Sequence, residues 1–337
     1  MTIGALGGLV FYFLSLPAPF MLGSMITCWV VGGLIPSARP LLTVPWPLRF
    51  AVVSLVAVVL GSYASPSTFG GMLNWWPSLL ALALSSIAMT WLSYAFFRLR
   101  GYDDLVAWFS AQPAGLSEIV TLAGRHTDKD YLVALFHLVR VSTVFLFAPL
   151  LVWVVAQDFD TQAVPAGQVH FWQLSWYMWL LFPLAAVLGT IVGRRIGLPM
   201  PSLLGPMLLT ALVSGSDLLV FERPFEVICL IQIALGASIG GRMGQVDFRK
   251  LWSAVPDAYL NAVVIIAMAL GVAGVVSILT AQPMLKIFLA ISPGGVSELS
   301  LIAVALGYEV AFITLHHLFR MAVVLFAMPV KQLPPEL

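Results

Sequence analysis

Long apolar runs, each bounded by proline, glycine or charged residues, follow one another along almost the whole sequence. Ten of them lie at about 1–16, 20–36, 48–64, 74–97, 131–155, 171–193, 200–216, 225–241, 254–280 and 310–330. A helix that crosses a bilayer needs about 20 predominantly apolar residues, and most of these runs approach that length. With 61% hydrophobic and 9% charged residues, the composition excludes a soluble globular protein. We predict an all-α integral membrane protein with short loops and no separate soluble domain.

Two further apolar stretches, at 104–124 and 284–306, are interrupted near their middle. The interruptions read QPAG at 112–115 and SPGG at 292–295. Proline lacks a backbone N–H and clashes with the preceding helical turn, and glycine weakens a helix interior. Each stretch is therefore predicted to be a helix broken into two arms.

The chain also repeats itself. The sequence LPAPFMLGSM at 16–25 recurs as LPMPSLLGPM at 198–207, which is an offset of 182 residues. The sequence PAGLSE at 113–118 recurs as PGGVSE at 293–298, which is an offset of 180. Self-similarity at a nearly constant offset indicates a duplicated structural unit.

The offset of 180 also links polar residues of two later helices. It carries His137 onto His317 and Arg140 onto Arg320. Identity of so many residue types at one offset is not expected by chance. We therefore divide the chain into a first membrane repeat at 1–156, a linker loop at 157–170 and a second membrane repeat at 171–337.

Loop charges indicate how the two repeats lie in the bilayer. If both broken stretches enter and leave on the same side, each repeat has about five crossings and the second is inverted. Twelve loop lysines and arginines then lie on one side, and only Arg223 and Lys286 lie on the other. If both stretches cross instead, the same charges divide seven against seven. Because cytoplasmic loops are enriched in Lys and Arg, we predict inverted repeats with re-entrant hairpins and both termini in the cytoplasm.

Charge and metal-ligand chemistry narrow the classes of function. A formal net charge of +1 without a basic run gives no attraction to nucleic acid, so no nucleic-acid partner is expected. A metal enzyme needs clustered ligands, but only His316 and His317 are close in sequence, and Cys28 and Cys229 lie in separate apolar runs. Adjacent residues point about 100° apart on a helix and seldom bind one metal. We expect no metal, no cofactor and no enzymatic activity.

The two breaks form the candidate substrate site. Its residues there are Pro113, Gly115, Ser117, Pro293, Gly294, Gly295 and Ser297. Non-helical backbone at membrane depth is tolerated only where protein or a water-filled cavity surrounds it. The serines are expected to cap the returning arms, which leaves amide N–H groups for an anion, whereas carbonyls freed at the break would suit a cation. A tight bend that serves packing alone is the structural alternative.

A glutamate follows each break. A carboxylate at that depth must be paired, protonated or bound to a cation, so Glu118 and Glu298 are candidate coupling-ion sites. A favourable carboxylate at a helix N-terminus is the alternative. The sequence does not separate the two interpretations.

A histidine and an arginine lie deep in one helix of each repeat. Arg140 comes ten residues after Tyr131, so it lies ~15 Å along the helix, near the middle of a ~30 Å core. Arg320 is its counterpart, and His137 and His317 precede the arginines by three residues on the same helix face. The arginines and His317 are candidate ligands of an anion, and His137 is a candidate for the coupling ion. A structural ion pair with the glutamates is the alternative, and the two roles are compatible.

Glycines mark expected close contacts between helices. Gly23 and Gly205 follow the two LPxP sequences by one turn, and Gly61 and Gly236 lie within later apolar runs. Small residues let helix backbones approach closely in membranes. We predict that these positions serve packing.

In combination, the two LPxPxxLGxM corners, the PxGxSE elements and the HxxR helices resemble the AbrB family of bacterial membrane proteins, which carries a duplicated unit. The likeness covers nearly the whole chain and implies a multi-pass protein of the bacterial inner membrane. Family members have been labelled ammonia monooxygenases, and one was tied to regulation of another gene's expression. The fold is similar to that of the cation/proton antiporter and anion transporter superfamily, which implies a homodimer with a scaffold part and a moving transport part.

The sequence and the resemblance together favour a secondary transporter. We expect alternating access for a small solute, an organic anion, coupled to H⁺ or Na⁺, with the lipid bilayer and a second copy of the chain as partners. The alternative is a membrane-embedded regulator or sensor that affects gene expression. The monooxygenase label is disfavoured because the histidines are scattered.

Overall fold

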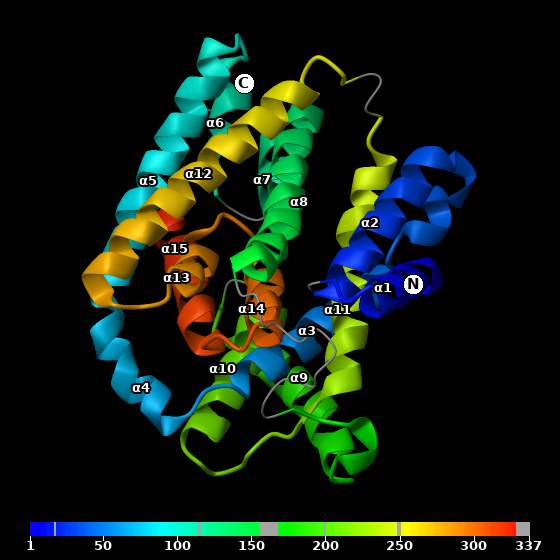
Figure 1. Cartoon of the computed structure of the whole chain (residues 1–337), viewed down its shortest axis with the longest axis vertical. Helices are drawn as coiled ribbons and strands as arrows, with labels where there is room; N and C mark the ends of the chain where they lie inside the picture. Colours follow the sequence, from blue (N-terminus) through cyan, green and yellow to red (C-terminus); the bar gives the residue numbers. More distant parts are fainter. Residues whose placement is uncertain (17, 114–115, 156–167, 199, 248–250, 328–337) are drawn as a thin grey trace. The chain divides into compact units, whose positions relative to one another are not determined.

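The computed structural model describes the chain except for residues 17, 114–115, 156–167, 199, 248–250 and 328–337 (Figure 1). The helices before the gap at 156–167 are α1 (Thr2–Phe13), α2 (Pro19–Leu34), α3 (Trp46–Gly61), α4 (Pro66–Met72), α5 (Trp76–Leu99), α6 (Asp104–Ala111), α7 (Leu116–Ala123) and α8 (Asp130–Val155). Those after it are α9 (Met178–Arg195), α10 (Pro201–Gly215), α11 (Phe225–Gln245), α12 (Val255–Thr280), α13 (Met284–Ile291), α14 (Val296–Ala305) and α15 (Val310–Ala327).

Short elements make up the rest of the assigned structure. Three 3₁₀ turns lie at Pro36–Leu42, Leu73–Trp75 and Phe171–Gln173. In the described part of the chain, the only strands are β1 (Gln168–Val169) and β2 (Arg223–Pro224), which pair in parallel. The predicted all-α architecture is confirmed, and the boundaries of the helices follow the prolines and glycines that bound the apolar runs.

Five helical stretches are long and apolar enough to cross a bilayer. They are Pro66–Leu99, Asp130–Val155, Met178–Arg195, Phe225–Gln245 and Val255–Thr280. A sixth span is possible if the bent pair Pro36–Leu42 and Pro47–Gly61 counts as one, and four other apolar helices have only 10–17 residues. The chain is therefore an all-α membrane protein, while the ten crossings and the inverted orientation of the repeats stay predictions.

The LPxP corners take the same backbone conformation twice. Ala18 and Met200 occupy the N-cap positions of α2 and α10 with φ of 43° and 50°, in the left-handed region. The helices then begin with Pro19 and Pro201, whose fixed φ suits a first helical position. The same strained residue at an offset of 182 is the structural counterpart of the repeated sequence.

The chain divides into two compact units. The first contains Met1–Asn74, Phe145–Asp247 and Ser297–Thr314, and the second contains Trp75–Val144, Phe248–Val296 and Leu315–Leu337. Each unit thus takes segments from both predicted repeats. The boundary between them falls inside α8, which also contains Pro149.

Glycine contacts hold the helices of the first unit together. In this unit α2 packs on α1 and α11, and α10 packs on α9 and α3. A methyl group added at Gly23 would lie 2.9 Å from Gly8 Cα of α1, and one added at Gly205 would lie 3.3 Å from Gly193 Cα of α9. Since both distances are too short for a real Cβ, the predicted packing role of these glycines is confirmed.

Gly61 and Gly236 have the same role one layer further on. A methyl group at Gly61 of α3 would lie 2.9 Å from Thr210 Cβ of α10, and one at Gly236 of α11 would lie 3.1 Å from the Met21 carbonyl carbon of α2. The packing prediction is confirmed for these two positions as well.

Candidate functional site

The two interrupted stretches are broken where proline predicts. α6 ends at Ala111 and α13 ends at Ile291. The next residues, Gln112 and Ser292, have extended backbones with ψ of 130° and 135°, as expected of residues that precede proline. The second arms begin after the breaks as α7 and α14. The breaks are confirmed, and whether each pair of arms re-enters or crosses the bilayer stays a prediction.

Arg140 of α8 reaches back to the first break. Its Nη2 donates to the Gln112 carbonyl at 3.0 Å and lies 2.9 Å from Nδ1 of His137. Nε2 of His137 lies 2.9 Å from the Phe109 carbonyl at the end of α6. Because a carbonyl only accepts, Nε2 carries the hydrogen and Nδ1 accepts from the arginine, which makes His137 a neutral imidazole. This histidine therefore ties α8 to α6 and orients Arg140.

Arg320 of α15 does the same at the second break. Its Nη1 donates to the Ser292 carbonyl at 2.5 Å and its Nη2 to the Gly294 carbonyl at 2.7 Å. Nε2 of His317 donates to the Leu289 carbonyl at 3.0 Å. The contacts at Phe109 and Gln112 thus recur at Leu289 and Ser292, 180 residues later. Unlike its counterpart, His317 has no partner for Nδ1 in the described part of the chain.

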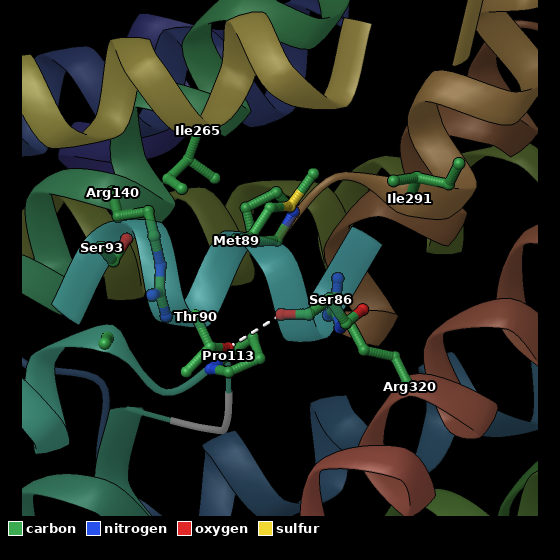
Figure 2. Close-up of a pocket in the computed structure, with 11 residues that line it drawn as sticks. Ser86, Met89, Thr90, Ser93, Pro113, Arg140, Ile265, Ile291 and Arg320 are labelled. Atoms are coloured by element: carbon green, nitrogen blue, oxygen red, sulfur yellow. Dashed lines mark hydrogen bonds between the residues drawn. The ribbon is translucent and has the colours of Figure 1, made fainter. Parts of the chain in front are cut away.

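Both arginines line one cavity in the second unit, together with a proline from each break (Figure 2). The complete lining is Ser86, Met89, Thr90, Ser93, Ala111, Pro113, Arg140, Ile265, Ile291, Pro293 and Arg320. The space open to the centre of a water molecule is about 10 Å³, enough for roughly one water. Four of the predicted site residues, Pro113, Arg140, Pro293 and Arg320, are thereby brought together.

One face of α5 supplies the hydroxyl groups of this cavity. Ser86, Thr90 and Ser93 are each at most 3% exposed, and their spacing places them on one helix face. The Ser93 hydroxyl and the Asn261 side chain of α12 hydrogen-bond each other at 3.1 and 3.2 Å. Sequence analysis missed these residues, although hydroxyl groups spaced by four and three residues in an apolar run were a usable signal.

The serines and glutamates after the breaks have a different outcome. Ser297 lies inside the first turn of α14, which begins at Val296, and its hydroxyl donates to Glu298 Oε2 at 2.7 Å. The expected capping by Ser297 is therefore wrong, because Gly295 already precedes the first helical residue. Gly115 and the side chains of Ser117 and Glu118 lie outside the described residues.

His316 makes a separate contact in the second unit. Its Nε2 lies 2.8 Å from the Ser78 hydroxyl of α5, which itself donates to the Trp75 carbonyl at 2.8 Å. The corresponding residue of the first repeat, Phe136, instead packs against Phe97 with ring centroids 4.4 Å apart. The contact to α5 is therefore specific to the second repeat.

Comparison with known proteins places the chain in a family. The family described as "Transition state regulatory protein AbrB" matches residues 20–332. The chain belongs to the AbrB family. This AbrB-family chain is 28% identical over 325 residues to "Putative regulator AbrB" of Escherichia coli (strain K12), with 95% of the chain and 90% of that protein covered. It is 23% identical over 347 residues to "Uncharacterized protein YhjN" of Bacillus subtilis (strain 168), with 98% and 90% covered.

Proposed function

We propose that this AbrB-family chain is a secondary active transporter of a small organic anion in the bacterial inner membrane. One observation carries the proposal: two buried arginines, each bonded to carbonyls at its own helix break, line a single cavity with a proline of each break. Buried charge within a membrane protein marks a substrate or ion pathway. Paired broken helices are typical of transporters that work by alternating access.

The arginines are suited to an anion more than to a structural role alone. A guanidinium presents its donors in a planar fork that matches a carboxylate. Arg140 and Arg320 spend part of that fork on backbone carbonyls, and this fixes their orientation. Their Nε atoms have no partner in the described part of the chain. A prepositioned donor without a partner supports ligand binding at the cavity.

Cation coupling belongs to the same proposal. We assign the coupling ion, H⁺ or Na⁺, to Glu118 and Glu298, with His137 as a third candidate. Both nitrogens of His137 already have partners, so a proton-carrying role there requires the bond to Arg140 to break. The glutamates are the better candidates. The proposal includes a homodimer and no catalytic activity.

Uptake into proteoliposomes tests the transport function. The purified chain is reconstituted, and accumulation of labelled succinate, lactate and glutamate is measured under an imposed pH or Na⁺ gradient. We expect at least one of these anions to accumulate above empty liposomes. Arg140→Gln and Arg320→Gln should each reduce the rate at least about tenfold, since a hydrogen bond to a charged group contributes about 1.5–3 kcal/mol.

A matched control removes an arginine elsewhere. Arg194 ends α9 in the first unit, with its guanidinium 5.5 Å from the centroid of the Phe50 ring, and Arg194→Gln should transport normally. Normal uptake by both cavity variants, once size-exclusion profiles show that they are folded, would refute the site. Absence of gradient-driven uptake for the whole panel would count against the transporter.

The printed name of the Escherichia coli relative supports a second candidate, a membrane-embedded regulator of gene expression. A deletion strain that carries a folded, transport-inactive Arg140→Gln variant separates the two functions. If this variant restores the wild-type transcript profile, the regulatory function does not depend on transport. If it fails to do so, the effect on expression follows from transport.

A further inference from the structure

The cavity holds two cationic side chains whose hydrogen-bonding capacity is incompletely used. Arg140 is 5% exposed and Arg320 is 4% exposed. The Nε of each has no hydrogen-bond partner among the described residues. Buried donors are nearly always satisfied in native proteins, and an uncompensated charge at membrane depth is costly. Both features indicate that an anionic partner completes the site.

The lining that the structure describes does not itself supply that partner. Apart from the arginines, it consists of three hydroxyl side chains on α5 and of apolar residues and prolines, with no carboxylate. Two positive charges therefore face groups that hydrogen-bond but do not neutralise them. A ligand with two negative charges would balance the pair, whereas a monoanion would leave one charge buried without compensation.

The arrangement of the lining favours two separate anionic groups. In the view of Figure 2, Arg140 and Arg320 lie at opposite ends of the group, with Met89 of α5 between them. Ile265 and Ile291 add further apolar surface to the lining. Methylene groups gain from contact with such side chains, but an inorganic dianion would lose hydration there without compensation. The arginines are also equivalent under the offset of 180 residues, which suits a ligand with similar ends.

We infer that this cavity binds a small dicarboxylate, with one carboxylate on the free Nε edge of Arg140 and the other on that of Arg320. Hydroxyls of Ser86 and Thr90 are available to the same ligand, and each is buried on the α5 face of the cavity. Identification of the dicarboxylate as the transported substrate rests on the proposed function, but its binding does not. The present space fits about one water, so this conformation is closed and the site must widen to admit the ligand.

Ligand-induced stabilisation of the detergent-purified chain tests the binding site without transport. Thermal unfolding is followed in a chloride-free buffer at constant ionic strength, with succinate, butyrate or sulfate as the probe. A ligand that binds only the folded state raises the unfolding midpoint as its concentration rises. We expect an apparent Kd for succinate at least about tenfold below those for butyrate and sulfate, because only succinate engages both arginines and the apolar lining.

Variants assign the preference to the two arginines. Arg140→Gln and Arg320→Gln should each bring the Kd of succinate to within about threefold of that of butyrate, while Arg194→Gln keeps the wild-type ratio. Arg140→Lys and Arg320→Lys keep the charge but lose the Nε edge, so they should also lose most of the preference. If the variants do not fold, the wild-type comparison decides the question.

Three results would overturn the inference. The first is equal stabilisation of the wild-type chain by butyrate or sulfate, and the second is a succinate preference that survives both glutamine variants. The third is a wild-type chain that no anion stabilises, which would mean that the charges are balanced within the chain. Succinate binding without succinate uptake would leave this site standing and would refute the proposed transport of its ligand.

Discussion

Replacement of Gly240 by alanine tests the packing of α11 against α2 in the first unit. A methyl group at this position would lie 2.8 Å from the carbonyl carbon and 2.9 Å from Cα of Met25, and nearer still to the Met25 oxygen. These are backbone atoms of the neighbouring helix, so no side-chain rotation relieves the overlap. The two helices must separate or the substitution must strain one of them.

The expected cost of Gly240→Ala follows from two opposed contributions. Overpacking of a close contact costs about 1–3 kcal/mol, whereas the change from glycine to alanine in a helix contributes about 0.5–1 kcal/mol in favour of folding. The net effect is a destabilisation of about 1–2 kcal/mol. The control is Gly271→Ala in α12, where an added methyl group meets no atom within 4 Å. This control should keep the helix contribution alone and be neutral or slightly stabilising.

The free energy of unfolding is measured for both variants in the same mixed micelles by titration with a denaturing detergent. The difference between them should be about 2–3 kcal/mol, the sum of the overpacking cost and the lost control gain. If Gly240→Ala is as stable as Gly271→Ala, the close approach of α2 and α11 does not limit the packing and our account of the glycine contacts is wrong.

Two other predictions concern the ends of the helices. Asp257 is 5% exposed and accepts from Arg100 Nε at 2.7 Å and from the Tyr102 hydroxyl at 2.8 Å, so Asp257→Asn should cost about 1–2 kcal/mol, a modest amount because Arg100 is half exposed. Burial and the bond to Asp257 raise the pKa of Tyr102; its contribution to stability is therefore present below the pKa of an unfolded tyrosine, about 10, and is lost as the pH rises above it. Spectroscopic titration should show a lower tyrosine pKa in the asparagine variant, and an unchanged titration would contradict this assignment. Single cysteines at Thr127 and Tyr308, in a chain without its native cysteines, should label from the inside and the outside respectively, whereas outside labelling at both would refute the inverted repeats.

Much of the fold was predictable because proline and glycine act locally. The breaks at Pro113 and Pro293 required only that proline cannot continue a helix, and they lie where predicted. The packing of Gly23 and Gly205 was predictable for a similar reason, since a glycine in an apolar helix has few other uses. The repeated sequence also predicted that equivalent residues would make equivalent contacts, as Arg140 and Arg320 do.

The remaining features depend on long-range packing, which periodicity does not encode. The hydroxyl face of α5 could not be distinguished from ordinary packing serines until Ser86 and Thr90 were seen to line a cavity with residues 50 to 230 positions later in the chain. The compact units were also not predictable from the repeats, because each unit combines segments of both. The capping role expected of Ser297 failed because a shift of two residues along the helix changes which hydrogen bond a hydroxyl can make.

Pro149 has a mechanical consequence for the helix that the two units share. In α8 the residue four positions before it is Phe145, the first residue of the first unit on that helix. Proline has no N–H to bond the Phe145 carbonyl, so the helix lacks one rung of its ladder where one unit ends and the other begins. Bending is cheapest at such a site. Any swing of one unit against the other can therefore be absorbed at a single point of α8, which keeps the His137 and Arg140 end of the helix rigid while the far end turns.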